Sequence, residues 1–303
     1  MATLNHSYVS NLIWMLEAAL FRVVSTVTRL VPIDFASNCG AALFRMLGPL
    51  TPAHRVAERN LRLVFPEADS AEINQRLRAQ WSELGRTAAE YTNLDRIVAD
   101  PGRVEVEGAE RLATIAAGAG PVVFISGHFS NFELMPAAII QAGVNCQITY
   151  RAMNNPHVDK MVRENRFRYG VRLFAPKGLD GARELMRGLG RGESVALMND
   201  QKFNGGIAAP LFGRIAHTAP GPATFALRFG IPIQPMSVQR IGDQARFKVI
   251  VHDPIHLVDT GDRDADIEAG VRRINAFIEE RVRARPDEWF WVHKRWPGEM
   301  YRD

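Results

Sequence analysis

The residues best suited to chemistry lie in the segment GHFSNFE, residues 127–133. The apolar run before it predicts a strand over residues 122–126, and a helix is expected over residues 131–142. His128 would then follow the strand end, and Glu133 would lie in the first helical turn. A histidine exchanges a proton near neutral pH, and a neighbouring carboxylate fixes its tautomer and stabilises the imidazolium. The spacing therefore predicts a general base, His128, oriented by Glu133.

Such a base would take the proton from an alcohol as its oxygen attacks a thioester carbonyl. Amide groups at the helix start, or a nearby cation, would stabilise the resulting oxyanion, with Gly127 leaving room for a ligand to approach the backbone. The same residues also allow a structural interpretation, because Ser130 and Glu133 have the spacing of a capping box. A helix cap does not require His128 at the strand end, and this favours the catalytic interpretation.

Other chemistries have weaker support. A serine hydrolase would use Ser126 or Ser130 as nucleophile, but no G-x-S-x-G elbow is present. His252 and His256 have the spacing of a helical zinc pair, yet Pro254 between them prevents that helix, and no metal or cofactor is predicted. A pI of about 9.3 alone suggests nucleic acid, but without a recognition motif no nucleic-acid partner is expected.

Beyond Pro101, short β-branched runs alternate with helical patterns, which predicts an α/β domain with a mixed, largely parallel sheet flanked by helices. In such sheets the active groups follow the carboxyl ends of strands. The expected strands are residues 122–126, 147–150, 194–198, 233–240 and 245–251. The expected helices are residues 72–91, 131–142, 156–169, 181–189, 220–229 and 266–283.

Residues 12–31 form an apolar segment that contains Glu17, Arg22 and Arg29. These charges make a membrane span doubtful. At ~100° per residue they fall in one half of the helical wheel and leave the other half apolar. The helix could lie in a membrane interface or pack its apolar half on its own domain. No secretory cleavage site follows, and we expect membrane-associated helices over residues 1–48 and an α/β domain over residues 49–303.

Charge is unevenly distributed along the 303 residues, whose net charge is +4. Residues 151–191 contain ten Lys and Arg against four Asp and Glu. A surplus of this kind attracts phosphate groups, acidic proteins or anionic lipid, although a solvated face is an equally simple explanation. Cys39 and Cys146 have no partner at metal-ligand or redox spacing, so reduced thiols are expected.

Five ordered blocks carry a resemblance to a known family. GHFSNFE resembles the His-x4-Asp/Glu motif of the glycerolipid acyltransferases, in particular the lysophospholipid-acyltransferase branch that contains the late acyltransferases of lipid A biosynthesis. Later blocks of that branch resemble, in the same order, YRAMNNP, LMNDQ, PLFGRIAHTAPGPATFALRFGIPIQP and WFWVHKRW. The likeness covers roughly residues 50–300. One departure is that glycerol-phosphate enzymes usually have Asp where this chain has Glu133, which makes a glycerolipid acceptor less expected.

The resemblance implies roles for residues after the strand ends. His128 would be the base and Glu133 its orienting partner. Arg151 would place positive charge near the oxyanion or a substrate phosphate, although a surface ion pair is an alternative. Asp200 would support the active-site wall, unless it only forms a turn. Two further residues precede the helix expected over 220–229, where amides could bind a phosphate or simply cap the helix: Thr218 and Gly221.

The resemblance also implies partners and a location. The acyl donor would be an acyl carrier protein thioester, and the acceptor a Kdo-bearing, phosphorylated disaccharide lipid with a free hydroxyl. Residues 151–191 would suit either the acidic carrier protein or the acceptor phosphates. The enzyme would lie at the inner membrane with its catalytic domain facing the cytoplasm. The alternatives are another glycolipid or phospholipid acceptor, or a non-catalytic peripheral membrane protein.

Overall fold

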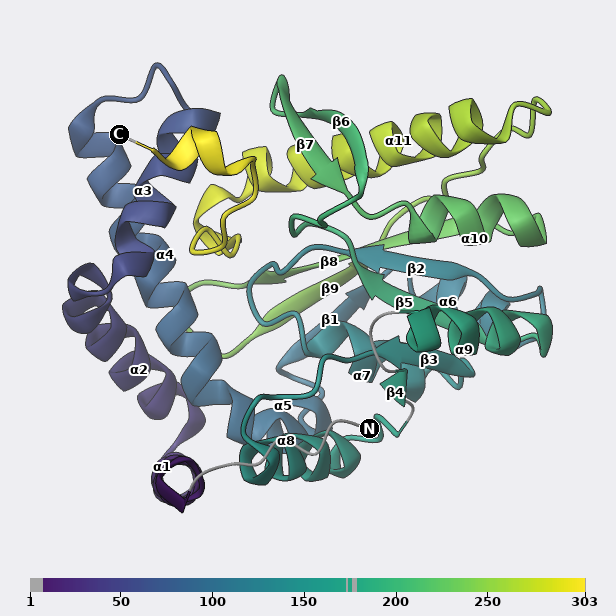
Figure 1. The fold of residues 1–303 in the computed structure, drawn as a ribbon. Coiled ribbons are helices and arrows are strands. Elements are labelled where there is room, and N and C mark those ends of the chain that lie inside the picture. The colour runs from purple at the N-terminus through teal and green to yellow at the C-terminus, as the bar shows by residue number, and fades with distance from the viewer. Residues whose placement is uncertain (1–7, 173, 176–178, 303) are drawn as a thin grey trace.

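The computed structural model describes residues 8–172, 174–175 and 179–302. Lys177, one of the basic residues of segment 151–191, lies outside the described residues. The first third of the chain is helical (Figure 1). Its elements are α1 (Tyr8–Leu30), α2 (Ile33–Leu47), α3 (Pro52–Val64), α4 (Ser70–Glu90) and α5 (Leu94–Ala99), with 3-10 turns at Gly48–Leu50 and Tyr91–Asn93.

The rest of the described chain contains strands and helices. The strands form a seven-stranded sheet in the order β1-β9-β8-β2-β5-β3-β4 and a separate hairpin, β6-β7. Strand pairs are parallel except for β8 with β9 in the large sheet and β6 with β7 in the hairpin. The strands are β1 (Val104–Glu107), β2 (Val123–Ser126), β3 (Cys146–Thr149), β4 (Phe174–Ala175), β5 (Ser194–Met198), β6 (Ile207–Leu211), β7 (Arg214–Thr218), β8 (Ile233–Arg240) and β9 (Phe247–Val251).

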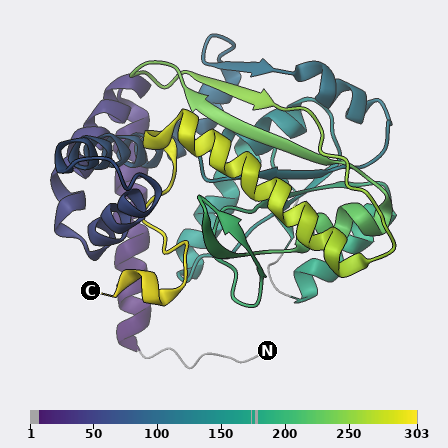
Figure 2. The same ribbon diagram turned by 90° about the horizontal axis from the view of Figure 1, so that it is seen from above.

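Helices lie on both sides of this sheet, with α10 and α11 on one side and α7 on the other (Figures 1 and 2). They are α6 (Ala109–Ala116), α7 (Leu134–Gln141), α8 (Pro156–Arg168), α9 (Leu179–Gly190), α10 (Gly221–Phe229) and α11 (Arg263–Ala284), followed by 3-10 turns at Pro286–Glu288 and Gly298–Tyr301. The predicted class, a mixed and largely parallel sheet flanked by helices, is confirmed. The division at residue 48 stays a prediction.

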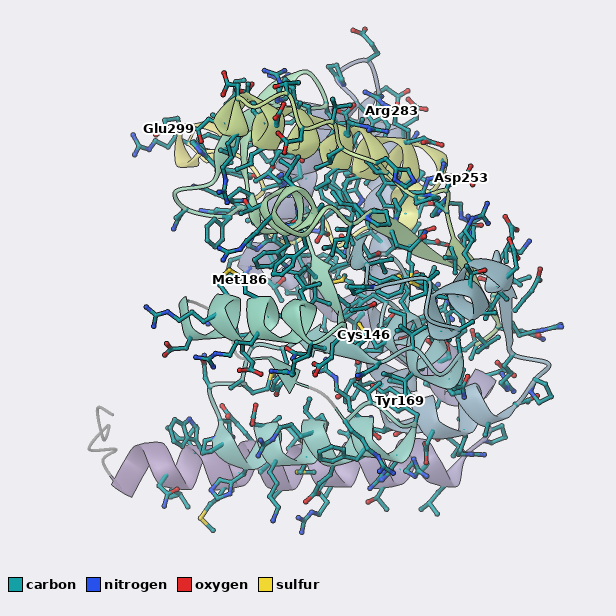
Figure 3. All side chains as sticks on the ribbon, turned by 90° about the vertical axis from the view of Figure 1, so that its right-hand side faces the viewer. Cys146, Tyr169, Met186, Asp253, Arg283 and Glu299 are labelled. Carbon is teal, nitrogen blue, oxygen red and sulfur yellow. The ribbon has the colours of Figure 1, made fainter. Side chains whose placement is uncertain are left out.

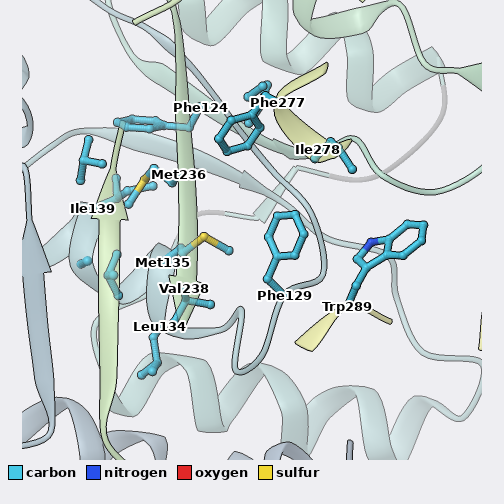
Figure 4. Close-up of a cluster of buried hydrophobic side chains, with 14 of the residues drawn as sticks. Phe124, Phe129, Leu134, Met135, Ile139, Met236, Val238, Phe277, Ile278 and Trp289 are labelled. Carbon is cyan, nitrogen blue, oxygen red and sulfur yellow. The ribbon is translucent and has the colours of Figure 1, made fainter. Parts of the chain in front are cut away.

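The core joins the sheet to the helices on its two sides. Phe124 from β2, Met236 from β8, Ile139 from α7 and Phe277 from α11 all belong to one buried cluster, and Figure 4 shows their side chains. Parallel strands require apolar side chains to be buried on both faces of the sheet, and β2 and β8 are accordingly buried along nearly their whole length.

Three strand regions were not predicted. β1 is only four residues long, and its side chains alternate between half-buried and exposed with two glutamates outward. The hairpin strands contain Pro210 and several alanines, which give little β-strand signal. β4 has two residues. By contrast, β5 and β8, which lie inside the sheet, begin and end where predicted.

Helix α1 turns its polar side toward the domain. Glu17 accepts a hydrogen bond from Asn155 Nδ2 at 3.0 Å, and Arg29 forms a two-bond ion pair with Asp95 at 2.8 and 2.9 Å. Its apolar side is exposed along its length, at Leu12, Leu16, Leu20, Val23, Val24, Val27 and Leu30. Residues Asn11–Leu30 are long and apolar enough to cross a membrane by composition, with a mean hydropathy of 1.2. The interpretation in which the apolar half packs on the domain is therefore wrong.

A buried group of polar residues ties α4 to the end of β8. Arg240 donates to Glu83 at 2.7 and 2.9 Å and to Glu90 at 2.6 and 3.0 Å. Ser130 Oγ donates to Glu83 at 2.5 Å, and Asn131 Nδ2 donates to Glu90 at 3.0 Å. Burial alone would lower the pKa of Arg240, but the two carboxylates outweigh it and raise that pKa. We call these five residues the Arg240 cluster.

Arg240→Met is expected to lower the free energy of unfolding by about 3–5 kcal/mol, because it leaves two buried carboxylates without their cation. Urea denaturation of the full chain measures this. The control is Arg183→Met, which removes an exposed ion pair with Asp180 and should change stability by about 0–1 kcal/mol. Equal stability of the two variants would show that the Arg240 cluster adds nothing beyond a surface pair.

His252 directly follows β9, and its Nε2 lies 2.8 Å from Ser237 Oγ. The ring meets Phe277 edge-on, with centroids 5.1 Å apart. Burial lowers the pKa of His252 to about 4. Among the described residues, no group of three or more His, Cys, Asp or Glu side chains is arranged to hold a metal ion. His252 is therefore a packed, neutral residue beneath α11.

The lowered pKa of His252 predicts a pH dependence of stability. A histidine in the unfolded chain gains a proton below about pH 6.5, whereas folded His252 resists protonation until about pH 4. Its stabilising contribution is thus complete above pH 6.5 and is lost as the pH falls toward 4. Between pH 6.5 and 4 the melting temperature of His252→Gln should fall less than that of the native chain. His157→Gln, which replaces an exposed histidine, should lose as much as the native chain. Identical profiles for the two variants would contradict the assignment.

Candidate active site

Two neighbouring parallel strands bring the central residues together. In the register of β2 with β5, Ser126 is paired with Met198, and Asn199 N donates to Ser126 O at 2.9 Å just beyond the pair. His128 and Asp200 each lie two residues past their strand end. The sheet therefore places an imidazole and a carboxylate side by side at its carboxyl edge, where functional groups of α/β folds gather.

Asp200 holds His128 by two hydrogen bonds. Its Oδ2 accepts from the backbone N of His128 at 2.8 Å, and its Oδ1 lies 2.8 Å from Nδ1 of the ring. The indole Nε1 of Trp289 donates to the same carboxylate at 2.8 Å. Three N–H groups thus fix the plane of the Asp200 carboxylate and, through it, the orientation of the imidazole.

Electrostatics keep Asp200 ionised although only 2% of it is exposed. Burial raises its pKa, but the charge of His128 and the hydrogen bonds from His128 and Trp289 outweigh burial and lower the pKa to about 2. A carboxylate at Nδ1 selects the tautomer with the proton on Nδ1, which leaves the lone pair of Nε2 available to accept a proton.

Aromatic residues lie beside the imidazole ring of His128. Phe132 meets the His128 ring edge-on at 4.8 Å between centroids, and Phe290 lies 6.0 Å away. Within residues 8–172, 174–175 and 179–302, Nε2 receives no hydrogen bond. An aromatic surround with one accessible base suits a reaction from which bulk water is excluded.

Glu133 does not contact His128, and this corrects the expected pairing. Its carboxylate is bound by Arg166 at 2.5 and 3.0 Å and by the hydroxyl of Tyr169 at 2.9 Å. The cause is the path of the backbone: Ser130 has a φ of 42°, and α7 begins only at Leu134. The left-handed residue turns the chain before the helix starts, so Glu133 points toward α8 rather than toward the histidine.

The capping-box alternative is wrong as well. Ser130 Oγ donates to Glu83 of the Arg240 cluster, and Glu133, the N-cap residue of α7, makes no side-chain cap hydrogen bond. The backbone N of Ser130 donates to Glu288 O at 2.7 Å, while Asn131 is held by Glu90. The segment after His128 is therefore held by the carboxylates of α4, which Arg240 of β8 binds, and by the backbone of the C-terminal tail.

Gly127 was expected to leave room for a ligand, but neighbouring side chains occupy the space beside it. A Cβ at this position would lie 2.7 Å from the ring of Phe129 and 3.3 Å from Cβ of Asp200. Phe129 in turn forms a β-bridge with Trp289, and their rings lie next to each other in Figure 4. The space beside Gly127 is filled by these neighbours rather than left for a ligand.

The serines considered as nucleophiles are bonded elsewhere. Ser126 is buried, and its Oγ donates to Met236 O at 2.7 Å. Ser130 Oγ is held by Glu83. Since neither hydroxyl is hydrogen-bonded to His128, the geometry of a serine hydrolase is not assembled here.

The other predicted site residues differ in their surroundings. Arg151 is exposed between β3 and α8. Thr218 is fully buried at the end of β7, where Arg295 donates to its Oγ1 at 2.6 Å, so the hydroxyl does not cap α10. Gly221 is the first residue of α10 and is half-buried. A phosphate site at these amides stays a prediction.

Trp289, Arg295 and Arg166 were missed as parts of the site. Burial lowers the pKa of Arg295 to about 10, despite the opposing charge of Asp200. The sequence did contain a signal for the tail, namely its many aromatic residues. Three of them, Trp289, Trp291 and Trp296, are buried. Nothing in the spacing could have indicated that Arg166, 33 residues after Glu133, would bind it.

A 1-acyl-sn-glycerophosphate (LPA) acyltransferase, PlsC, from Thermotoga maritima is 12% identical, with 84% of this chain and 99% of that chain covered, but a TM-score of 0.36 establishes no shared fold. A dihydroxy-acid dehydratase from Geobacter sp. (strain M21) is 43% identical over 63 residues, which span 18% of this chain and only 11% of that protein's length.

A family model matches nearly the whole chain. The model of the bacterial lipid A biosynthesis acyltransferases matches residues 7–297, a span that includes the His128–Asp200 pair and the tail that holds it. This agrees with the resemblance of the five ordered blocks. The chain belongs to the family of bacterial lipid A biosynthesis acyltransferases.

Proposed function

We propose that this chain is an O-acyltransferase that moves a fatty acyl group from an acyl carrier protein thioester to a hydroxyl of a lipid A precursor. Family membership supports acyltransferase activity. The observation that carries the mechanism is the hydrogen bond of 2.8 Å between His128 Nδ1 and the buried carboxylate of Asp200. It leaves Nε2 as the base.

In the proposed reaction, Nε2 of His128 removes the proton of the acceptor hydroxyl as the oxygen attacks the thioester carbonyl. The tetrahedral intermediate collapses, the C–S bond breaks, and the imidazolium returns its proton to the leaving thiolate. Asp200 stabilises the imidazolium during this cycle. Arg151, which is exposed beyond β3, would supply positive charge to the oxyanion or to an acceptor phosphate.

In this proposal Glu133 acts as a positioning residue rather than as the partner of His128. By binding Arg166 and Tyr169 it joins the catalytic segment to α8. Its carboxylate opposes the burial of Arg166 and raises the pKa of that guanidinium, so the pair stays charged. Loss of Glu133 would leave a cation at this junction without its partner.

The partners follow from charge and exposure. Acyl carrier proteins are acidic, and segment 151–191 is basic, although Arg183, Arg187 and Arg191 already have acidic neighbours. The amides near Thr218 and Gly221 would receive a phosphate of the acceptor. The exposed apolar side of α1 would rest in the inner membrane with the catalytic domain facing the cytoplasm.

His128→Ala is expected to lower the transfer rate by about 10²–10⁴-fold, the usual contribution of a general base. The assay follows labelled acyl groups from acyl carrier protein to a Kdo-bearing, phosphorylated lipid A precursor in mixed micelles. Lysophosphatidic acid serves as the competing acceptor. Transfer that is unchanged in His128→Ala, with membrane binding intact, would instead favour a peripheral membrane protein without catalysis.

Asp200→Asn and Glu133→Gln separate the two acids. Asp200→Asn should lower kcat by up to about 10⁴-fold with little change in KM, because an amide can stabilise the wrong tautomer. Glu133→Gln should mainly lower the melting temperature, since it leaves Arg166 without its carboxylate. A loss of kcat in Glu133→Gln together with normal turnover in Asp200→Asn would show that Glu133 is the acid that matters.

A further inference from the structure

A groove runs between α1 and α8, on different elements from the catalytic pair. It has a volume of about 740 Å³ and is open on one side. The two helices lie side by side along one edge of the molecule, with α1 outermost (Figure 3). Small side chains of α1, Ala18 and Ala19, make the hollow, and Val23 and Val27 extend its apolar wall.

The two ends of the groove are closed by polar contacts between α1 and the domain. At one end, Asn155 Nδ2 donates to Trp14 O at 2.8 Å and to Glu17 at 3.0 Å. At the other end, Thr28 is hydrogen-bonded to Thr92 at 2.8 Å, next to the ion pair of Arg29. These contacts fix α1 against the rest of the domain on either side of the stretch that lines the groove.

The two walls differ in chemistry. The α1 wall is apolar and continues into the exposed apolar side of that helix. The α8 wall is polar and carries His157, Lys160 and Glu164, while Arg22 enters from α1. Lys160 and Glu164 are 3.9 Å apart and largely exposed, so their attraction is weak and leaves the lysine available. With Arg22 and Lys160 against Glu164, the groove has a surplus of positive charge.

We propose that this groove binds one acyl chain of an anionic membrane phospholipid, with its phosphate held by Arg22 and Lys160. A largely apolar groove with one cation on each helix matches a molecule whose chain and charged head are covalently joined. The chain would lie along Ala18, Ala19 and Val23, and the head would lie between Arg22 of α1 and Lys160 of α8. α1 would thus help to bind a single lipid molecule, in addition to associating with the bilayer surface.

Photo-crosslinking tests the occupant. The probe is phosphatidylglycerol with a diazirine at the end of one acyl chain, carried in phosphatidylcholine vesicles and added to the full chain. Labelled peptides are then mapped by mass spectrometry. The groove predicts label on both α1 and α8. Label on α1 alone would overturn the proposal, because simple immersion of α1 in the bilayer would give that result.

Val23→Trp and Val24→Trp form a matched pair, since both valines are exposed on α1 but only Val23 lines the groove. Val23→Trp should fill the hollow and abolish labelling of α8, whereas Val24→Trp should leave it unchanged. Equal labelling in both variants overturns the proposal. Circular dichroism checks that both variants keep their helix content.

The head-group contacts have their own test. Arg22→Gln and Lys160→Gln should each reduce the preference of labelling for phosphatidylglycerol over a phosphatidylcholine probe by about fivefold, the effect of about 1 kcal/mol per basic residue at an anionic surface. Arg183→Gln, on α9, is the control. An unchanged preference in both groove variants overturns the assignment of the phosphate. His128→Ala should label like the native chain, so this result is independent of the proposed catalysis.

Discussion

The carboxylate of Asp200 is the point on which the site depends. Three N–H groups from two distant parts of the chain, His128 and Trp289, converge on it inside the protein. Hydrogen bonds to a charged acceptor are stronger than those between neutral groups. Together with the charge of His128, they outweigh burial and hold the pKa of Asp200 at about 2. The sheet, the catalytic segment and the C-terminal tail therefore meet at one ionised group.

The register of β2 with β5 explains why this meeting point exists. Because Ser126 and Met198 are paired, the residues two positions further on each strand are neighbours. The segment after His128 would still be free to move if only Asp200 held it. The Arg240 cluster removes that freedom, because Glu83 and Glu90 of α4 accept hydrogen bonds from Ser130 and Asn131. Arg240 of β8 in turn binds both carboxylates. Positioning is thus shared between the His128–Asp200 hydrogen bonds at the carboxyl edge of the sheet and the buried ions of the Arg240 cluster.

Much of the fold could be predicted from the sequence. The strands β5 and β8 have the expected bounds, and the amphipathic pattern identified α1 and its two faces. Which face of α1 meets the protein could not be predicted, because periodicity does not say what covers a surface. The answer depends on partners such as Asn155 and Asp95, which are far away in the sequence.

The site was predicted in part. His128 was recognised from its place after a strand, whereas the family resemblance gave Asp200 only a supporting role in the active-site wall. The pairing with Glu133 was expected because helix periodicity was carried back to residue 131. The left-handed Ser130 breaks that periodicity, and a non-glycine residue with positive φ gives no sequence signal. Contacts between residues 72 positions apart, such as His128 and Asp200, need the sheet order, which the sequence does not state.

The most direct measurement of the central claim is nitrogen NMR of the full chain with ¹⁵N-labelled histidine, which reports the protonation of each ring nitrogen of His128. The account predicts a protonated, hydrogen-bonded Nδ1 and an unprotonated Nε2 in the resting protein, with the Nδ1 signal altered in Asp200→Asn and retained in Glu133→Gln. A ring protonated on Nε2, or a Nδ1 signal that responds to Glu133→Gln and ignores Asp200→Asn, would contradict it.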